Sequence, residues 1–569
     1  MPRSASTWLT SVHRRLSSRF NTWTVLTVGV ALIVALPVLV VLAHIVMPTQ
    51  GIWQHLASTV LGRYLTNTLF LVITVGLGTA AIGTGTAWLV AMCRFPGHRI
   101  FEWALLLPLA VPTYVIAYAY TDFLQYAGPL QTWLRELFGW GQEDYYFPSI
   151  RSLGGAAILI TMVLYPYVYL LARAAFLEQS VCVLDVGRTL GRGPWRLFTS
   201  VAVPLARPAI IGGVSLVLME TLNEFGAVQF FGVDTFTTGI YRTWFGMGEQ
   251  VAAAQLAACL LLFVIIVVLL ERWSRGRRKY FHTTGRYQQL PEYRLIGWRA
   301  LGAFTACTIP VLIGFVVPGA LLTHLAIQEG DALLGTRFLD FASNSLILAA
   351  LASLVAVGLA VILSYGVRLH PGPVSRTATR IAAMGYAIPG SVVAVGILIP
   401  FAWLDSEING ILREHYGIAA GLIFSGSAFI LIYAYVVRFL AVSFNTVEAS
   451  LGKVTPTMDA AARTLGQTAS GTLRRVHAPI MRGSLFAAAI LVFVDVMKEL
   501  PATIILRPFN FDTLAVRAHN LASDERLAEA STSSLAIVVV GIIPVILLSM
   551  AIRRSRPGTR QVSRKDEDL

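Results

Sequence analysis

The sequence has little charge for its length and few cysteines. Only 13% of its 569 residues are charged, whereas 56% are hydrophobic. Soluble proteins carry about a quarter of charged residues, so this composition excludes an ordinary soluble enzyme. The four cysteines, Cys93, Cys182, Cys259 and Cys307, are scattered and form no C-x-x-C. The sequence therefore indicates neither a zinc site nor a disulfide framework.

Motifs for nucleotide and catalytic chemistry are missing as well. No G-x-x-x-x-G-K-[ST] occurs, because Gly452-Lys453 is followed by Val454 and lacks the upstream glycine. Any ATP hydrolysis must therefore take place on a separate chain. Neither H-E-x-x-H nor G-x-S-x-G occurs, and no pair of mid-span catalytic aspartates is found. We predict no catalytic residue, no cofactor bound by this chain and no nucleic acid partner.

Long hydrophobic runs fill most of the chain instead. They are about twenty residues long, the length that a helix needs to cross ~30 Å of hydrocarbon. We therefore predict an all-α polytopic membrane protein with about twelve spans. The predicted spans are 23–46, 65–92, 101–121, 152–176, 205–228, 251–270, 300–323, 343–367, 381–404, 417–444, 483–504 and 532–552. No small-x-small site follows Val46, so we interpret the first run as an uncleaved span.

The basic residues predict the orientation of these spans. With the N-terminus inside, 31 of the 44 Lys and Arg residues fall in inner segments and 9 in outer ones. Short loops rich in Lys and Arg stay on the cytoplasmic side. The formal net charge of +14 is then a topology signal, and no basic soluble domain suited to nucleic acid stands out. We expect a multi-pass membrane protein with both termini in the cytoplasm.

Several segments recur in the same order along the chain. The recurring pairs are Asn67–Leu71 with Asn344–Leu348, Ala110–Pro112 with Ala387–Pro389, Tyr165–Val168 with Tyr433–Val436, and Arg188–Gly191 with Arg463–Gly466. Repeats of this kind indicate a duplicated architecture. Because each half has an even number of spans, the two six-helix repeats are predicted to be parallel.

The predicted boundaries follow from this duplication. Residues 1–60 hold the N-terminal cytoplasmic segment and first span, and 61–271 the first transmembrane domain. Residues 272–341 hold a basic cytoplasmic linker, the seventh span and an outer loop. The second transmembrane domain covers 342–552, and a basic tail covers 553–569.

The most distinctive repeated element follows the fourth span of each half. Each copy is predicted to form a short helix, a glycine stop, a second short helix and a proline that enters the next span. Acidic and basic residues at i, i+3 or i, i+4 can pair on an exposed helix face. The alternative, a surface loop without function, does not explain why the element recurs. The candidate residues are Asp185, Arg188 and Gly191 in the first copy, and Asp459, Arg463 and Gly466 in the second.

This element resembles the E-A-A-x-x-x-G loop of permease subunits in binding-protein-dependent ABC importers. In that family the loop forms a coupling helix that sits in a groove of the ATPase subunit. Gly191 and Gly466 occupy the motif glycine, and Asp185 stands for the glutamate. In the second copy Ala460 takes the glutamate position and Asp459 lies one residue earlier. The resemblance implies a type I ABC importer permease fold, two copies of an ATPase that binds ATP and Mg, and a soluble substrate-binding protein.

Charged and polar residues also match at the ends of the fifth and eleventh predicted spans. Matching positions place two carboxylates at i, i+4 in each half, which puts them on one face of a continuous helix. A charge inside a span costs about 2.5–3.5 kcal/mol at its centre, which suggests a use. One use is an acidic passage for a cation. The structural alternative is a closed polar network in which Lys498 pairs with Asp495 or Glu224 and Asn223 ties the two halves together. A gate that breaks and remakes such pairs would satisfy both interpretations. The residues are Glu220, Asn223 and Glu224, and Asp495, Lys498 and Glu499.

The outer loops carry a more specific resemblance. Asp234-Thr235 in the first loop recurs as Asp512-Thr513 in the second. These loops closely resemble those of fused permeases of ferric-iron ABC importers, and the likeness extends over nearly the whole chain. It implies ferric iron as cargo, with transient contact of Fe(III) at Glu224 and Glu499 and no tightly bound metal. Fe(III) prefers oxygen ligands, which agrees with acidic residues near the entry path.

Two alternatives remain open. Thiamine permeases share the fused architecture, so thiamine or another small solute is the alternative cargo. A secondary transporter also fits twelve spans in two halves, and it should show helices broken in mid-membrane. It has no reason, however, to repeat a docking element.

Overall fold

The computed structural model describes residues 22–49, 51–141, 143–177, 179, 189–190, 193–275, 293–329 and 336–554. Eleven helices in these residues are long and apolar enough to cross a membrane, or twelve if one bent pair counts as a single span. The predicted all-α polytopic fold is therefore confirmed. Within the same residues, β1 (Cys93–Arg94) and β2 (Tyr293–Arg294) pair in parallel.

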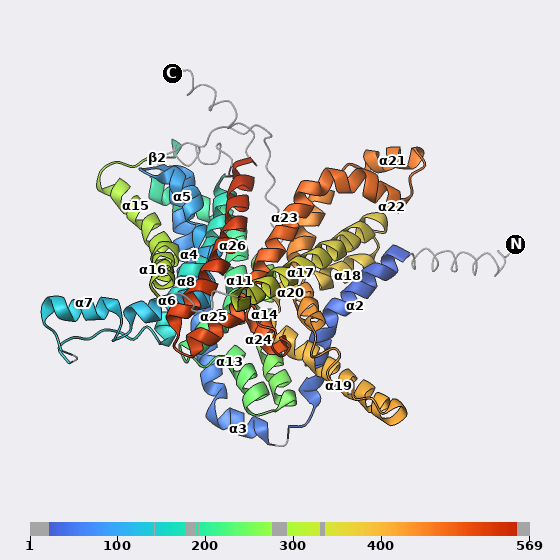
Figure 1. Ribbon diagram of the computed structural model, residues 1–569. Coiled ribbons are helices and arrows are strands. Elements are labelled where there is room, and N and C mark those ends of the chain that lie inside the picture. The colour runs from blue at the N-terminus through green and yellow to red at the C-terminus, as the bar shows by residue number, and fades with distance from the viewer. Residues whose placement is uncertain are drawn as a thin grey trace. The chain divides into compact units, whose positions relative to one another are not determined.

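The chain divides into two compact units, and Figure 1 labels helices of both. Unit 1 comprises Met1–Pro48 and Ala342–Asp512, and unit 2 comprises Thr49–Phe341 and Thr513–Leu569. The first span thus groups with the second half of the sequence, while the seventh and last spans group with the first half. The domain boundaries at 61–271 and 342–552 remain a prediction, since compactness and repeat structure divide the chain differently.

Unit 1 is built on long helices with short helices between them. Its elements are α2 (Thr22–Ala43), η1 (His44–Val46), α17 (Thr336–Leu369, from Ala342), α18 (Pro373–Ala382), η6 (Gly385–Ala387), α19 (Gly390–Tyr416), α20 (Ala428–Leu451), α21 (Pro456–Thr464), α22 (Ala469–Thr472), η7 (Leu473–His477), α23 (Ala478–Met497) and α24 (Pro501–Leu506).

Close backbone approach holds α2 in unit 1. A Cβ on Gly396 of α19 would lie 2.2 Å from the carbonyl oxygen of Pro37, so only glycine fits there. Tyr433 of α20 donates a hydrogen bond of 2.5 Å to the carbonyl of Ile33. Such small-residue contacts are typical of helix packing in membranes, where lipid leaves no hydrophobic driving force between helices.

Unit 2 contains the remaining elements. They are α3 (Ile52–Thr59), α4 (Leu61–Met92), β1, α5 (His98–Ala104), η2 (Leu107–Ala110), α6 (Thr113–Leu124), α7 (Pro129–Phe138), α8 (Leu153–Leu177), α10 (Pro194–Leu197), η3 (Phe198–Ala202), α11 (Val203–Asn223), α12 (Gly226–Phe230), α13 (Phe236–Tyr241), η4 (Arg242–Gly246), α14 (Gln250–Arg275), β2, α15 (Trp298–Val311), η5 (Leu312–Val316), α16 (Val317–Glu329), α25 (Leu514–Ser523) and α26 (Leu527–Arg554).

Glycines also set the packing of unit 2. A Cβ on Gly83 of α4 would lie 2.9 Å from the carbonyl oxygen of Tyr165 in α8, and α11 packs against both helices. The seventh span joins them at Gly314, where a Cβ would lie 2.7 Å from the carbonyl of Met162. The last helix, α26, packs against α16 and α25.

The third and ninth spans differ from the prediction. Continuous helices at 101–121 and 381–404 are wrong, because both are interrupted at the repeated Ala-x-Pro segments. Pro112 and Pro389 cap the helices that follow, with φ of −61° and −58°, and the residue before each is extended. A proline disfavours helix in the residue before it. In the first half the helices meet at 90°.

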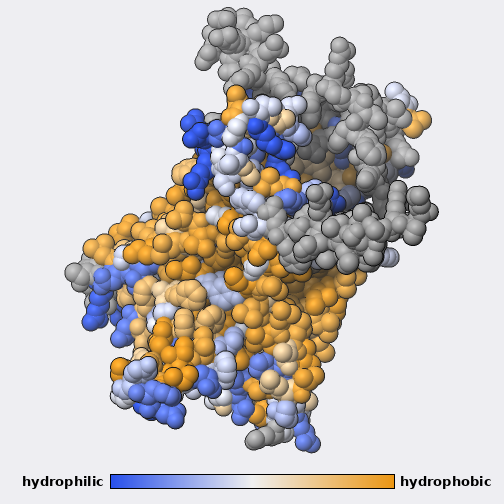
Figure 2. Space-filling model, turned by 90° about the vertical axis from the view of Figure 1, so that its right-hand side faces the viewer, coloured by the Kyte–Doolittle hydropathy of each residue, from blue (hydrophilic) through white to orange (hydrophobic). Residues whose placement is uncertain are grey.

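Apolar side chains face outward over much of the surface. On the face shown in Figure 2, hydrophobic side chains form a broad area and hydrophilic ones gather toward its two ends. Exposed Val25, Leu32 and Ile33 of α2, with Leu354 of α17, are examples from unit 1. A contiguous apolar surface this large suits lipid rather than water.

Candidate functional site

The second copy of the repeated element folds as predicted. Helix α21 ends at Thr464, and Gly466 follows with φ +76°, a left-handed conformation that favours glycine. Helix α22 comes next, and Pro479 lies in the first turn of α23. Figure 1 places α21 and α22 at one end of unit 1.

A π-helical turn precedes the proline in both halves. It covers Phe198–Ala202 in the first half and Leu473–His477 in the second, which are corresponding positions of the repeat. The widened turn lets the chain enter α11 and α23 although a proline there cannot donate a hydrogen bond. The duplication therefore extends to this local backbone feature.

Asp459 has different partners from those predicted. We expected it to pair with Arg463 on an exposed helix face, but it is held inward by Arg368 and His477. The Nη2 of Arg368 lies 2.9 Å from its Oδ2, and the Nε2 of His477 lies 2.6 Å from its Oδ1. Burial raises the pKa of Asp459, but the hydrogen bonds from Arg368 and His477 outweigh that effect and hold the pKa below its ordinary value.

The outer surface of α21 is left accessible. Arg463 is exposed, as are Met458 and Leu465, with Leu465 exposed over 79% of its surface. Ala462 is buried beneath them. A short helix with a mixed basic and apolar exposed face is suited to a protein groove.

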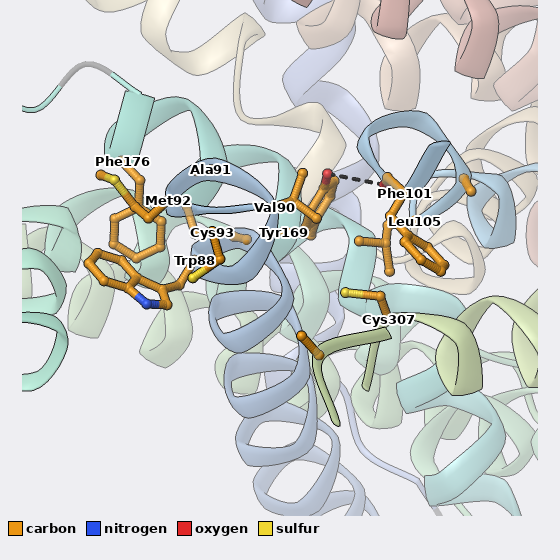
Figure 3. Packing of buried hydrophobic residues seen from close by; sticks show 14 of the residues in the cluster. Trp88, Val90, Ala91, Met92, Cys93, Phe101, Leu105, Tyr169, Phe176 and Cys307 are labelled. Carbon is orange, nitrogen blue, oxygen red and sulfur yellow. Dashed lines mark hydrogen bonds between the residues drawn. The ribbon is translucent and has the colours of Figure 1, made fainter. Parts of the chain in front are cut away.

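The first copy lies mostly outside the described residues, and these include Asp185, Arg188 and Gly191. Of the part that is described, Leu190 and Trp195 are strongly exposed, at 71% and 73%. Beside it, Trp88 of α4 packs edge-on against Phe176 of α8 and also contacts Phe198. Figure 3 shows Trp88 and Phe176 pointing toward each other.

The carboxylates Glu224 and Glu499 lie where helices break. Helix α11 ends at Asn223 and α23 ends at Met497, so neither carboxylate continues the helix that carries Glu220 or Asp495. The prediction of two carboxylates on one helix face is therefore wrong. Glu224 accepts a hydrogen bond from Ala227 N at 2.9 Å, and Glu499 accepts one from Ala502 N at 2.9 Å. Both side chains cap the short helix that follows.

Glu499 forms a buried ion pair. Its Oε1 lies 2.8 Å from Nη1 of Arg438, and the two side chains are exposed over only 1% and 6% of their surfaces. Its Oε2 accepts further hydrogen bonds from the backbone N and the hydroxyl of Thr503. Gly390 makes room for the pair, since a Cβ there would lie 2.8 Å from Oε1.

Glu224 has a different environment. The hydroxyl of Thr113, at the position that corresponds to Gly390, forms a hydrogen bond with it, and Leu170 stands where Arg438 stands. Among the residues that the structure describes, no Lys, Arg or His forms an ion pair with Glu224. Thr68, Leu71 and Leu260 are among the residues that line a small pocket at this carboxylate.

The remaining span residues divide into two groups. Lys498 pairs with Asp495, with Nζ 2.9 Å from Oδ1, which is one of the two partners predicted for it. Glu220 is half-buried in α11, and Asn223 is buried at its end. In the described ranges no three His, Cys, Asp or Glu side chains are grouped so as to hold a metal ion.

Two repeats that seemed separate in the sequence meet in each half. The amide of Asn67 donates to the carbonyl of Asp234 at 2.9 Å, and that of Asn344 donates to the carbonyl of Asp512 at 3.1 Å. The carboxylate of Asp234 pairs with Arg242, and that of Asp512 with Arg507. In both loops the backbone and the side chain of the aspartate are therefore held in place by hydrogen bonds and ion pairs.

Sequence reasoning missed the arginines and the histidine that hold these groups. Arg368, Arg438 and His477 have no counterpart in the first half, where Ala91, Leu170 and Ala202 stand. A search for repeats passes over such residues. The only signal for Arg438 was its position inside a predicted span, because a charge there needs a partner.

Comparisons with known proteins agree with the architecture. Residues 81–280 match the family described as "Binding-protein-dependent transport system inner membrane component". The chain is 27% identical to the Fe(3+)-transport system permease protein FbpB 2 of Haemophilus influenzae, over 86% of this chain and 90% of that protein. It is 21% identical to the ferric transport system permease protein FbpB of Actinobacillus pleuropneumoniae, over 89% of this chain and 73% of that protein.

A shorter relative is also similar. The molybdenum transport system permease protein ModB of Escherichia coli K12 is 28% identical over 33% of this chain and 81% of that protein. A third of this chain thus matches most of that permease, which is consistent with two permease repeats in one chain. Together the comparisons confirm the resemblance to permease subunits of binding-protein-dependent ABC importers that the sequence motifs indicated.

Proposed function

We propose that this chain is the membrane-spanning subunit of an ATP-driven importer that translocates ferric iron. A soluble binding protein delivers the iron at the outer face, and two copies of an ATPase subunit, with ATP and Mg, act at the cytoplasmic face. The observation that carries the proposal is the similarity to a ferric permease over 86% of this chain and 90% of that protein. Both termini then lie in the cytoplasm, as the basic residues predict.

The structure of the second repeated element supports coupling to an ATPase. Its glycine-terminated helix α21 presents an accessible face around Arg463, while Asp459 fastens it to the spans. Helices broken at Pro112 and Pro389 also occur here, and such breaks were the feature expected of a secondary transporter. Broken helices alone therefore do not favour that alternative, and the similarity to ABC permeases weighs against it.

The environments of the two carboxylates suggest different parts in iron transport. Glu499 already has a guanidinium and several hydrogen-bond donors, so binding a cation there would require the ion pair with Arg438 to break. Glu224 has hydrogen bonds but no ion-pair partner in the described ranges, and it borders a pocket. Transient contact with Fe(III), a hard cation that prefers oxygen ligands, is better suited to Glu224.

Uptake of radioactive ferric iron tests the proposal, with labelled thiamine measured alongside. Iron-starved cells with the chain, without it, and with Glu224→Gln are compared at matched protein level. Glutamine keeps the size and an acceptor oxygen but removes the charge. Glu414→Gln is the matched control, because it makes the same change at an exposed glutamate near the end of α19.

Each outcome has a distinct meaning. Loss of iron uptake on deletion, with thiamine uptake unchanged, supports the ferric cargo. Loss in Glu224→Gln but not in Glu414→Gln supports a role of the Glu224 carboxylate in transport. If deletion leaves iron uptake intact but abolishes thiamine uptake, the cargo proposal fails while the permease architecture stands. Uptake that needs a proton gradient but no ATPase chain would favour a secondary transporter.

A further inference from the structure

The guanidinium of Arg368 joins α17 to three other segments at one end of unit 1. It lies in the last turn of α17, and its Nε and Nη2 lie 3.0 and 2.9 Å from Oδ2 of Asp459 in α21. Its Nη1 donates to the carbonyl of Leu451 and its Nη2 to the carbonyl of Val454, both at 2.8 Å. One planar side chain therefore connects α17, the end of α20, the segment after it and α21.

His477 connects the same aspartate to a second span. Its ring is fully buried in the π-helical turn that begins α23, with Nε2 2.6 Å from Oδ1 of Asp459. Tyr365 packs edge-on against this ring, and its hydroxyl donates to the carbonyl of Ala469 at 2.8 Å. Asp459 is thus the point at which α21 is fastened to both α17 and α23.

The first half lacks every member of this group. At the corresponding positions the sequence has Leu184 for Asp459, Ala91 for Arg368 and Ala202 for His477. Trp88 replaces Tyr365, and it packs against Phe176 and Phe198. Aromatic packing tolerates several orientations at small cost, whereas charge-assisted hydrogen bonds fix direction and distance.

We infer that Arg368 and His477 are positioning residues that clamp the second coupling helix, α21, to spans α17 and α23. The inference rests on the proposed function. When the ATPase subunit moves α21, the clamp transmits that movement to the two spans rather than letting the helix swing alone. Ala91 and Ala202 stand at the positions of Arg368 and His477 in the first half, so this clamp has no sequence counterpart there.

The test uses the whole transporter, reconstituted in liposomes with its ATPase and its iron-loaded binding protein. Arg368→Ala removes the clamp, and Arg368→Lys keeps the charge but cannot reproduce the three hydrogen bonds that the guanidinium donates to Asp459, Leu451 and Val454. Arg376→Ala is the control, because Arg376 is an exposed arginine of α18 in the same unit. The readouts are the amount of ATPase bound, ATP hydrolysis with and without loaded binding protein, and iron uptake.

We expect Arg368→Ala to bind the ATPase at normal levels but to respond weakly to the binding protein. Stimulation of ATP hydrolysis and uptake should each fall about tenfold, with Arg368→Lys intermediate and Arg376→Ala like wild type. A residue needed only for stability would lower the amount of complex without changing stimulation per complex. If Arg368→Ala is absent from the membrane, Arg368→Lys decides the question in the same assay.

The failures are distinguishable. A wild-type complex without ATP-driven ferric uptake refutes the proposed function. A working wild-type complex whose assembled Arg368→Ala or Arg368→Lys variants keep full stimulation and uptake refutes the clamp alone.

Discussion

Glu499→Ala should destabilise the chain much more than Arg438→Leu, although the two residues form one ion pair. Removing the carboxylate leaves the buried guanidinium of Arg438 without its counter-ion, which costs about 3–5 kcal/mol. It also removes the cap of α24, which costs about 1 kcal/mol more. Arg438→Leu instead leaves Glu499 with the backbone N–H groups of Ala502 and Thr503 and a hydroxyl. That cost should resemble one lost charge-assisted hydrogen bond, about 1.5–3 kcal/mol.

The first half of the chain contains an arrangement similar to the one that Arg438→Leu creates, except that the hydroxyl of Thr113 is present where the second half has Gly390. Glu224 caps α12 with Leu170 at the position of Arg438, so a carboxylate in this break does not require an arginine. The measurement is the midpoint temperature of unfolding of the purified chain in one detergent, with Arg413→Leu as an exposed control. If Arg438→Leu is as damaging as Glu499→Ala, or if Glu499→Ala matches the control, the reasoning is refuted.

Three further predictions concern packing, the outer loops and pH. Gly396→Val should sharply reduce the amount of folded chain, because its Cβ would overlap the carbonyl of Pro37. Gly410 has open space around it, so Gly410→Ala should not reduce that amount. The amount of each variant in the membrane fraction measures both effects. Asn344→Ala should release the loop carbonyl of Asp512 and speed proteolysis of that loop in intact vesicles, and an unchanged rate would contradict the tether. The pKa of Asp459 is lowered by its partners, so its contribution to stability is full above about pH 4 and is lost as the pH falls through the lowered value. The stability difference between wild type and Asp459→Asn should therefore shrink as the pH falls below about 4, and a difference that stays constant down to about pH 2 would contradict this assignment.

Repeated segments predicted more of the structure than hydropathy did. Hydropathy indicated a continuous third span, yet the repeated Ala-x-Pro segment marks a break that ends at Pro112. The separate repeats at Asn67 and Asp234 proved to be the two ends of one hydrogen bond. Both signals were visible in the sequence, because a position kept in two copies of a fold carries a structural constraint.

The contacts that the sequence could not predict are those in which the halves differ. Arg438 and Glu499 are 61 residues apart, and Arg368 and Asp459 are 91 apart. Neither periodicity nor local propensity pairs such residues, since both act within a few turns. The ion pair expected between Asp459 and Arg463 satisfied local spacing, but a half-buried carboxylate is better compensated by two inward-facing donors than by one solvated arginine.

The two halves share backbone features but differ in their charged contacts. The backbone features are shared: the proline breaks, the π-helical turns, the capping carboxylates and the asparagine tethers occur in both. Arg368, Arg438 and His477 occur in the second half alone, whereas the ion pair between Arg173 and Glu102 occurs in the first half alone. In a dimer of two identical chains, a substitution appears in both copies. When the two halves are fused in one chain, a charged residue can be introduced into one half without the other. A charged side chain fixes the orientation of the partner that it binds, but burying it costs desolvation free energy that an apolar contact avoids. We therefore expect the second half to transmit force from the ATPase, and the first half, where Glu224 has no ion-pair partner in the described ranges, to meet the cation.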